Sequence, residues 1–318
     1  MNEYQRYLME EFADEYRERS MSRRDLLRRA VLIMGSVPAG LAALAAVGCG
    51  GDDSPESIAE ATKPQQPTVG TTPGASVAAS SATAVATSGS GTNAAAGAVR
   101  FFGPGSELLG YLAKPARAGT YPGVLIIHEN RGLNEHTRDI ARRYAGEGFI
   151  ALAVDLVSRA GGSKSDTAAN TGALGSAKIE DLVADMNAYA RYLQNMEGVK
   201  ATGIGVTGFC FGGGYAFESA FGSPEVKAVV PYYGICRLIE QLATTKAAIL
   251  AIYGALDTRV TSQAERVKAE LAKSGRPFDV QVYAGANHAF FNDTGASYNA
   301  TAAADAWTKT LAWFRANL

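Results

Sequence analysis

Five short apolar runs, with Lys227 as their only charged residue, restrict the fold that residues 100–318 can adopt. Strands exposed on one face alternate apolar and polar residues, whereas strands buried on both faces are apolar throughout. Unbroken runs are therefore typical of a parallel sheet that has helices on both sides. The runs span residues 123–127, 149–154, 204–206, 226–230 and 248–252.

Segments with helical spacing lie between and after these runs. They span residues 136–147, 178–195, 213–221, 262–274 and 301–317. Ser262 and Glu265 have the spacing of a capping box at the start of the fourth segment. Two earlier alternating segments, 98–102 and 108–113, predict an antiparallel hairpin. This order predicts an α/β domain with a mainly parallel, doubly wound sheet and the hairpin at its N-terminal edge.

Residues 1–48 have the pattern of an export signal. Arg23 and Arg24 precede an apolar stretch over residues 30–47, which is the order of a twin-arginine signal. Small residues then lead to Cys49, which we expect to be lipidated as the first residue of the mature chain. The alternative is an uncleaved anchor helix, since about 18 apolar residues nearly span a bilayer. We expect a protein of the cell envelope, outside the cytoplasmic membrane, with membrane contact only through this segment or its lipid.

Residues 49–99 have the composition of a linker. No charged residue occurs between Gln65 and Val99, and Ala, Gly, Ser and Thr fill 26 of the 32 positions 68–99. Such a segment lacks the large apolar side chains that would offset the entropy lost on folding, so we expect disorder. The remainder, residues 100–318, is long enough for one well-buried domain.

Charge and residue counts exclude several classes of protein. Residues 100–318 hold 22 Lys and Arg against 20 Asp and Glu, so they lack the basic excess of a nucleic-acid binder. Three cysteines are too few for a disulfide scaffold, and three histidines make a multi-histidine metal site unexpected. We expect a monomer that needs neither a metal nor an organic cofactor.

The turn after the third run carries a cysteine between glycines. Residues 208–214 are Gly-Phe-Cys-Phe-Gly-Gly-Gly, and this GxCxG pattern follows a strand and precedes a helix. In a nucleophile elbow, such glycines allow a sharp turn that exposes the central side chain at a helix N-terminus. Cys210 is therefore the candidate nucleophile, the alternative being a buried structural cysteine. The GxGxxG at 203–208 falls inside the strand and predicts no nucleotide site.

A thiol nucleophile needs a base and an acid that orients the base. Asp257 follows the fifth run, and His288 follows both Cys210 and Asp257 in the chain. Both lie in loops at the carboxyl ends of strands, where open α/β sheets place their sites. Glu129 follows the first run at the same rim, where a buried acid has no evident structural purpose. The sequence therefore predicts a catalytic set of Cys210, His288 and Asp257 with Glu129 beside it.

Four motifs in this order resemble the dienelactone hydrolase (carboxymethylenebutenolidase) family. They are His-Glu-Asn-Arg-Gly-Leu at 128–133, the elbow at 208–214, the loop with Asp257, and Asn-His-Ala-Phe at 287–290. The resemblance runs from about residue 123 to the C-terminus. It implies an α/β-hydrolase fold and the hydrolysis of a small ester or lactone through an acyl-cysteine intermediate.

The resemblance also implies roles for residues around the nucleophile. Glu129 would accept a hydrogen bond from the resting Cys210 thiol and release it when the substrate binds. The backbone N–H groups of Phe211 and Asn130 would form the oxyanion hole.

Further residues carry expectations outside this group. Arg159 loosely matches one of two arginines that would hold a substrate carboxylate, and Asn292 stands where the second would lie. A carboxylate is held less well without the second arginine, so the substrate stays unnamed. We expect His128 to be a strand-end histidine with satisfied hydrogen bonds, His136 to lie on a helix surface, and Cys236 to stay reduced.

Two other functions are compatible with these motifs. An acyltransferase or a broad-specificity esterase would use the same residues, because water and alcohols attack the same acyl intermediate. A non-catalytic surface-binding lipoprotein would need only the scaffold, and it would have no use for the complete set of Glu129, Cys210, Asp257 and His288.

Overall fold

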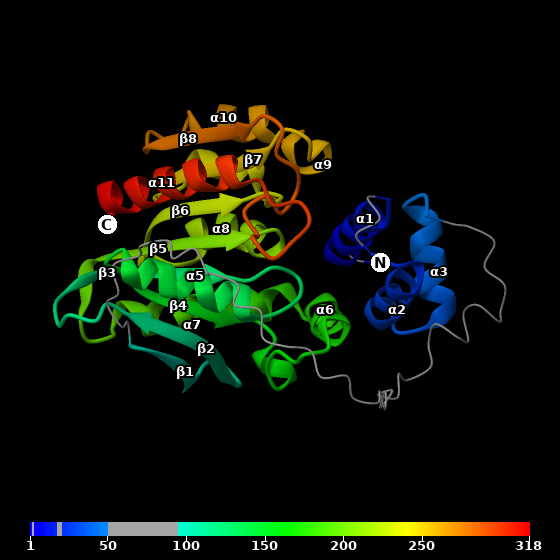
Figure 1. Cartoon of the computed structure of the whole chain (residues 1–318), viewed down its shortest axis with the longest axis horizontal. Coiled ribbons are helices and arrows are strands. Elements are labelled where there is room, and N and C mark those ends of the chain that lie inside the picture. The colour runs from blue at the N-terminus through cyan, green and yellow to red at the C-terminus, as the bar shows by residue number, and fades with distance from the viewer. Residues whose placement is uncertain (2, 18–20, 50–94) are drawn as a thin grey trace, which may run out of the picture.

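The computed structural model describes residues 1, 3–17, 21–49 and 95–318, so most of the expected linker lies outside the described residues. Residues 95–318 build one eight-stranded sheet in the order β1-β2-β4-β3-β5-β6-β7-β8 (Figure 1). β2 is antiparallel to β1 and β4, and all other neighbours are parallel. The strands are β1 (Ala95–Phe102), β2 (Glu107–Lys114), β3 (Tyr121–Ile127), β4 (Ile150–Asp155), β5 (Val199–Phe209), β6 (Val226–Tyr232), β7 (Ala248–Gly254) and β8 (Phe278–Tyr283).

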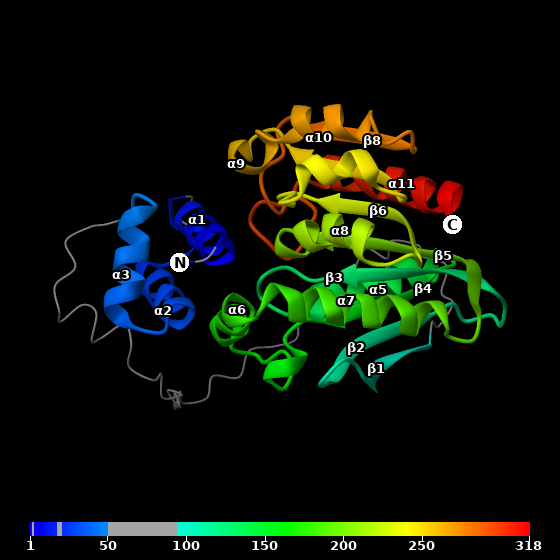
Figure 2. The ribbon, with the colours of Figure 1, turned by 180° about the vertical axis from the view of Figure 1, so that it is seen from behind.

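Helices cover both faces of the sheet. α5 (Glu135–Gly146) and α11 (Ala300–Asn317) lie in front of it in Figure 1. α7 (Ile179–Gln194) and α8 (Phe211–Gly222) lie in front of it in Figure 2, the view from behind. α10 (Ala264–Leu271) packs on β8 at the far edge. Every residue of β4 and β7 is buried, as expected for strands covered on both faces. The predicted doubly wound sheet with an antiparallel hairpin at its edge is confirmed.

Several element boundaries differ from those expected, and β5 starts five residues earlier than its apolar run. β1 begins at Ala95, so residues 95–99, assigned to the linker from composition, pair with β2. α10 begins at Ala264 without a capping box, because the hydroxyl of Ser262 donates to the carbonyl oxygen of Arg259. The short helix α9 (Thr258–Thr261) takes up that stretch of chain.

Besides the short α9, the helix α6 (Thr167–Ser176) was not predicted. Its sequence is rich in small residues and has no apolar periodicity, but Asp166 caps its start by accepting hydrogen bonds from the N–H groups of Ala168 and Ala169. The helix is further held by packing against an N-terminal helix, a long-range contact that local sequence does not encode.

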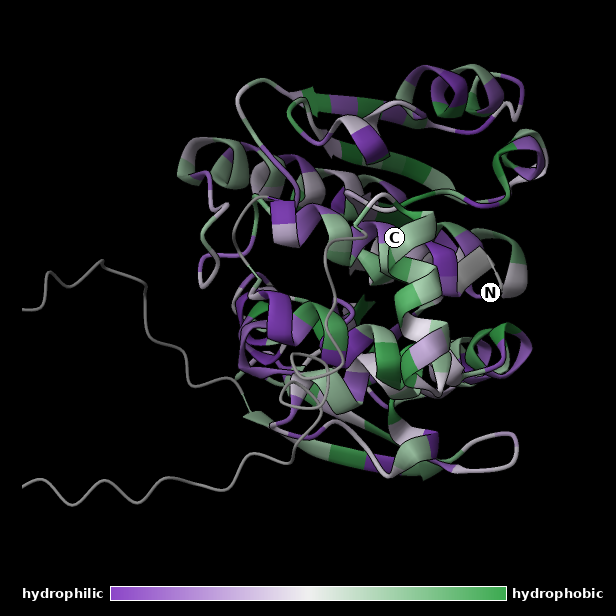
Figure 3. Cartoon of the chain, turned by 90° about the vertical axis from the view of Figure 1, so that its right-hand side faces the viewer, coloured by the Kyte–Doolittle hydropathy of each residue, from purple (hydrophilic) through white to green (hydrophobic). Residues whose placement is uncertain are grey.

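The N-terminal residues form three helices beyond the carboxyl ends of the parallel strands (Figures 1 and 2). They are α1 (Glu3–Arg17), α2 (Arg23–Met34) and α3 (Val37–Ala46). α3 has no charged residue and is white to green in Figure 3, which looks onto this end of the molecule. Among the described residues no single helix is long and apolar enough to cross a membrane, and α2 and α3 qualify only together, with a bend of 110°. The export signal and the lipidation of Cys49 stay predictions.

Candidate active site

Cys210 lies in the sharp turn between β5 and α8. Its backbone, with φ 57° and ψ −118°, is in a region that costs a non-glycine residue on the order of 1–3 kcal/mol. Glycines allow the chain to approach closely here. A Cβ on Gly212 would lie 2.5 Å from the carbonyl oxygens of Ile127 and His128, and one on Gly208 would collide with the Gly212 carbonyl. The turn therefore has the geometry expected of a nucleophile elbow.

The Cys210 side chain lines a cavity of about 300 Å³ at the carboxyl ends of the strands. Loops after β3, β5, β7 and β8 contribute its walls, and α1 forms the side away from the sheet. The charged and polar lining residues that matter for chemistry are Glu11, Asp14, Glu15, Glu129, Asn130, Arg131, Cys210, Asp257, Arg259, His288 and Asn292.

His288 and Asp257 are hydrogen-bonded at this cavity, with 2.5 Å between His288 Nδ1 and Asp257 Oδ2. Burial alone would lower the pKa of His288, but the charge of Asp257 and this hydrogen bond outweigh burial and raise it. The same contact lowers the pKa of Asp257 although that carboxyl is buried. Nε2 of His288 is thus the nitrogen left to accept a proton, and it has no hydrogen-bond partner among the described residues.

The Cys210 thiol is hydrogen-bonded to a residue of the N-terminal helix α1. Sγ donates to Oε1 of Glu11 at 2.9 Å, and the Tyr7 hydroxyl lies 3.8 Å from the same sulfur. A ring nitrogen of His288 lies within 4.8 Å of both Sγ and the Glu11 carboxylate. Burial, followed by the charges of Glu11 and Glu129, raises the pKa of Cys210 well above its usual value. The structure therefore holds Cys210 as a protonated thiol.

Glu129 lines the same cavity as Cys210, but its hydrogen bonds are made with Asn292. The Asn292 Nδ2 atom donates to both carboxylate oxygens, at 3.1 and 3.3 Å. The bond to Cys210 that the resemblance assigned to Glu129 is made by Glu11 in this structure. Asn292, in the position where an arginine was expected, is thus the partner of a buried acid.

The two residues expected to supply the oxyanion donors come from two different loops, after β5 and after β3. Phe211 is the first residue of α8, and its backbone N–H interacts with Cys210 and acts to lower the thiol pKa. Asn130 follows Glu129 and lines the cavity. Its loop is held in place because the backbone carbonyl accepts from the Thr171 hydroxyl and the side-chain Nδ2 donates to Glu11 at 2.6 Å.

Arg159 is not among the residues that line the cavity. Its guanidinium donates to both carboxylate oxygens of Asp185, at 2.8 and 2.9 Å, and to the carbonyl oxygen of Pro104. Asp185 is buried, so this contact neutralises an acid inside the domain. The structure accordingly places Arg159 in a structural ion pair and does not bring it to the other predicted site residues.

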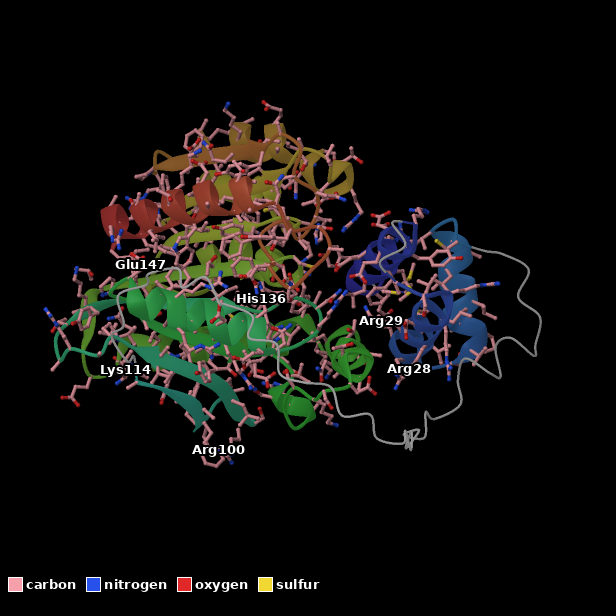
Figure 4. All side chains as sticks on the ribbon, in the orientation of Figure 1. Arg28, Arg29, Arg100, Lys114, His136 and Glu147 are labelled. Carbon is pink, nitrogen blue, oxygen red and sulfur yellow. The ribbon has the colours of Figure 1, made fainter. Side chains whose placement is uncertain are left out.

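The remaining histidines both have structural partners. His128 is bonded at both ring nitrogens, Nδ1 to the Glu129 carbonyl oxygen and Nε2 to the Leu156 backbone N–H, which confirms the expected satisfied histidine. His136, labelled in Figure 4, was expected on a helix surface, and this expectation is wrong: it is buried, with Nδ1 3.2 Å from Asp293.

The three cysteines are free thiols in different surroundings. Cys210 and Cys236 are buried, and burial raises the pKa of Cys236 to about 12. Cys49 follows α3 and is half-buried, with its backbone N–H bonded to the Leu44 carbonyl oxygen.

Among the described residues, one group of side chains could hold a metal ion: Glu11, Cys210 and His288. A sulfur ligand binds a metal as thiolate, whereas Cys210 is here a thiol that donates to Glu11. We therefore describe this group as a hydrogen-bonded cluster and assign it no metal.

A strained elbow after a central parallel strand, followed in the chain by an acid and then a histidine at the same rim, is the arrangement of the α/β-hydrolase fold. Residues 108–318 match the model of the dienelactone hydrolase family. A putative carboxymethylenebutenolidase from Synechocystis sp. is 33% identical over 229 residues, which cover 67% of this chain and 93% of the relative. The chain belongs to the dienelactone hydrolase family.

Further comparisons agree with this assignment. A crystal structure of a putative dienelactone hydrolase from Klebsiella pneumoniae is similar with a TM-score of 0.64 and 29% identity, covering 70% of this chain and 99% of that one. A probable 2-oxo-3-(5-oxofuran-2-ylidene)propanoate lactonase from Bradyrhizobium is 30% identical over 233 residues, 67% of this chain and 91% of the relative. The protein is accordingly a hydrolase that acts on an ester or lactone bond.

Several residues at the cavity were missed from the sequence. Arg131 lies in the motif at 128–133, in which roles were assigned only to neighbouring residues. Arg259 lies two positions after Asp257 and was assigned no role. Glu11 is the most distant in sequence from the rest. The spacing of Glu11, Asp14 and Glu15 places three acids on one helix face, and that face is the signal that could have identified them.

Proposed function

We propose that the chain hydrolyses a small ester or lactone through a Cys210, His288 and Asp257 triad and an acyl-cysteine intermediate. The proposal depends above all on the shared position of these side chains. All three line one cavity, Cys210 projects from the elbow, and the imidazole that lies within 4.8 Å of its sulfur is bonded on its other side to Asp257. This is the order nucleophile, base and orienting acid that acyl transfer requires.

The first half-reaction transfers the thiol proton to His288. As Sγ attacks the carbonyl carbon, its proton passes to Nε2, and the imidazolium that forms is stabilised by Asp257 at Nδ1. The raised pKa of His288 supports this step, because it makes the imidazole a better proton acceptor. When the tetrahedral intermediate collapses, Nε2 returns the proton to the leaving oxygen, which in a lactone stays attached to the acyl group.

The second half-reaction uses the same groups on water. Nε2 accepts a proton from a water molecule as it attacks the acyl-cysteine, and the Cys210 thiol is restored when the acid leaves. In both steps the oxyanion would be held by the backbone N–H groups of Phe211 and Asn130, and losing one such donor typically costs about 10²–10³ in rate.

Glu129 keeps the nucleophile protonated until a substrate is present. Its charge raises the pKa of Cys210, which opposes spontaneous thiolate formation. Because Asn292 holds the Glu129 carboxylate by two hydrogen bonds, the acid stays at the cavity.

We also propose that residues 1–48 direct export by the twin-arginine route and that Cys49 is lipidated. The sequence from Arg23 to Cys49 supports this, since a paired arginine precedes an apolar stretch and small residues precede the cysteine. The enzyme would then be anchored in the cell envelope with its domain on a tether.

The triad is tested by comparing two cysteine variants in the hydrolysis of a chromogenic acetate ester. Because Glu11 is bonded to the thiol, the assay is run on the wild type and on the Glu11→Ala chain. In the Glu11→Ala chain, we expect Cys210→Ala to lower kcat/KM by roughly 10³-fold or more. Cys236→Ala, which changes a buried cysteine outside the cavity, should retain activity. Equal turnover with and without Cys210 would refute the proposal.

A further inference from the structure

The acidic face of α1 lies against the mouth of the cavity, outside the part of the chain that matches the family. The family match begins at residue 108, whereas α1 is formed by Glu3–Arg17. Glu11 of this helix accepts hydrogen bonds from the Cys210 thiol at 2.9 Å and from Asn130 Nδ2 at 2.6 Å. The carboxylate thereby contacts the proposed nucleophile and the residue that would supply an oxyanion donor.

Two arginines of the enzyme domain bind the next acids of the same helix face. Arg259 donates to Asp14 at 2.8 Å, and Arg131 forms an ion pair with Glu15 at 3.2 Å. The Arg259 side chain is only 19% exposed, so this pair is partly shielded from solvent. The three acids of α1 are spaced three and four positions apart, so they lie on one helix face. On that face Glu11 contacts the thiol, and the next two acids each pair with an arginine at the cavity mouth.

A second contact joins α2 to α6, the helix of the domain that the sequence did not predict. A Cβ on Gly175 of α6 would lie 2.9 Å from the Ile33 side chain, and one on Gly172 would lie 3.0 Å from Leu32. Glycine at both positions lets the two helices approach closely. Arg28, labelled beside Arg29 in Figure 4, forms an ion pair with Asp166 at the start of α6.

The contact with α1 leaves the nucleophile unable to react. Cys210 is 3% exposed, its thiol is bonded to Glu11, and both burial and the Glu11 charge raise its pKa. An incoming carbonyl group would need the space next to Sγ and Asn130 that the Glu11 carboxylate fills. Intramolecular attachment gives α1 a high effective concentration, so the contact persists unless the segment is removed or bound elsewhere.

We propose that the cavity mouth is a docking site for the acidic face of α1 and that the chain is inactive while residues 1–48 remain attached. Removal of this segment at Cys49 would release Glu11 from Cys210 and open the cavity. Hydrolysis would thus begin only after the predicted signal is cut off. This inference rests on the proposed function for its consequence, but the docking itself is independent of the reaction.

The docking is tested by the rate at which iodoacetamide alkylates Cys210 in the full chain, followed by peptide mass mapping. Glu11→Ala and the double change Asp14→Lys with Glu15→Lys are expected to raise this rate roughly tenfold or more, since the thiol becomes accessible. Glu10→Ala, the matched change at the adjacent position of α1, is expected to leave the rate within about twofold. Cys236 reports on folding, because it is buried in the domain and should stay unreactive in every variant.

Cleavage of the tether provides the second measurement. A protease site is placed in the uncharged stretch 65–90, and the folded chain is cut and passed through a sizing column in about 1 M salt, which screens the ion pairs. We expect faster Cys210 alkylation and a gain of ester turnover after the N-terminal fragment is removed. Unchanged alkylation in the α1 variants and in the cut chain would overturn the docking. Faster alkylation without any ester turnover would support the docking and refute the proposed function.

Discussion

The Nδ1 atom of His288 lies 2.5 Å from Oδ2 of Asp257, and this contact sets the protonation of the imidazole that faces Cys210. Burial and Arg259 lower the pKa of His288, whereas Asp257 and Glu11 raise it, with a net upward shift. His288 must be neutral at Nε2 to accept the thiol proton. Activity should therefore be low below the pKa of His288 and rise as the pH passes through it.

The acid limb of kcat/KM tests this relationship in Asp257→Asn, with both proteins carrying Glu11→Ala so that the cavity is open. In the Glu11→Ala parent, the charge of Asp257 and its hydrogen bond still raise the pKa of His288 and hold the limb at higher pH. The amide removes the charge that raises the pKa, so burial dominates and the limb should move to lower pH. We also expect kcat/KM at its plateau to fall by roughly 10²–10⁴, because the imidazole loses its orienting acceptor. Asp305→Asn, which removes an exposed acid of α11, is the control, and a limb that stays in place in Asp257→Asn would contradict this account.

Asn292 should contribute to stability as the donor to buried Glu129. Asn292→Ala leaves the carboxylate without these two hydrogen bonds, which should lower the free energy of unfolding by about 1–3 kcal/mol. Denaturant unfolding measures the change. Asn195→Ala, at an exposed position after α7, should change stability by less than about 0.5 kcal/mol. Equal midpoints for the two variants would show that the Asn292 contact is not stabilising.

Arg159 should matter for the fold and not for the choice of substrate. Because Arg159→Gln leaves buried Asp185 without its cation, we expect a loss of about 1–3 kcal/mol in stability, less than for a fully buried pair. In the Glu11→Ala background, the ratio of kcat/KM for lactones with and without a carboxylate should stay the same. A selective loss of activity on the carboxylate-bearing lactone would instead assign Arg159 to the substrate.

The elbow should not tolerate a side chain at Gly212. In Gly212→Ala the added Cβ meets the carbonyl oxygens of Ile127 and His128 at 2.5 Å, so the strand ends or the turn must shift. We expect the midpoint temperature of thermal unfolding to fall by several degrees and turnover to be lost. Gly146→Ala in α5, where nothing lies within 4 Å of the new Cβ, should be neutral or stabilising by up to about 1 kcal/mol. Turnover is compared in the Glu11→Ala background, and a Gly212→Ala protein as stable and active as that parent would contradict the elbow geometry.

Most of the sheet could be predicted because the apolar residues of each strand already indicate that the strand is buried. The run 248–252 became β7, buried along its whole length, and 226–230 became β6. The Cys210 elbow was equally local, since glycines on both sides of one residue let the chain approach closely at a sharp turn. His288 and Asp257 could be placed together because the loops that follow parallel strands all lie at the same edge of the sheet.

Features that depend on distant contacts could not be predicted. α6 has small residues in place of an apolar stripe, and it needs the close approach of α2 that Gly172 and Gly175 permit. His136 is buried because it pairs with Asp293, far along the chain. Glu11 lies in a charged, amphipathic helix whose sequence indicates a solvated face, and only the cations and the thiol of the domain give that face a partner.

Identification of the acylated residue tests the central claim most directly. The Glu11→Ala chain is mixed with a chromogenic acetate ester, quenched with acid during turnover, digested, and examined by mass spectrometry. The account predicts an acetyl group on the peptide that contains Cys210, formed during turnover and lost as the substrate is consumed. Turnover accompanied by acetylation at another residue, or by none, would contradict an acyl-cysteine mechanism at Cys210.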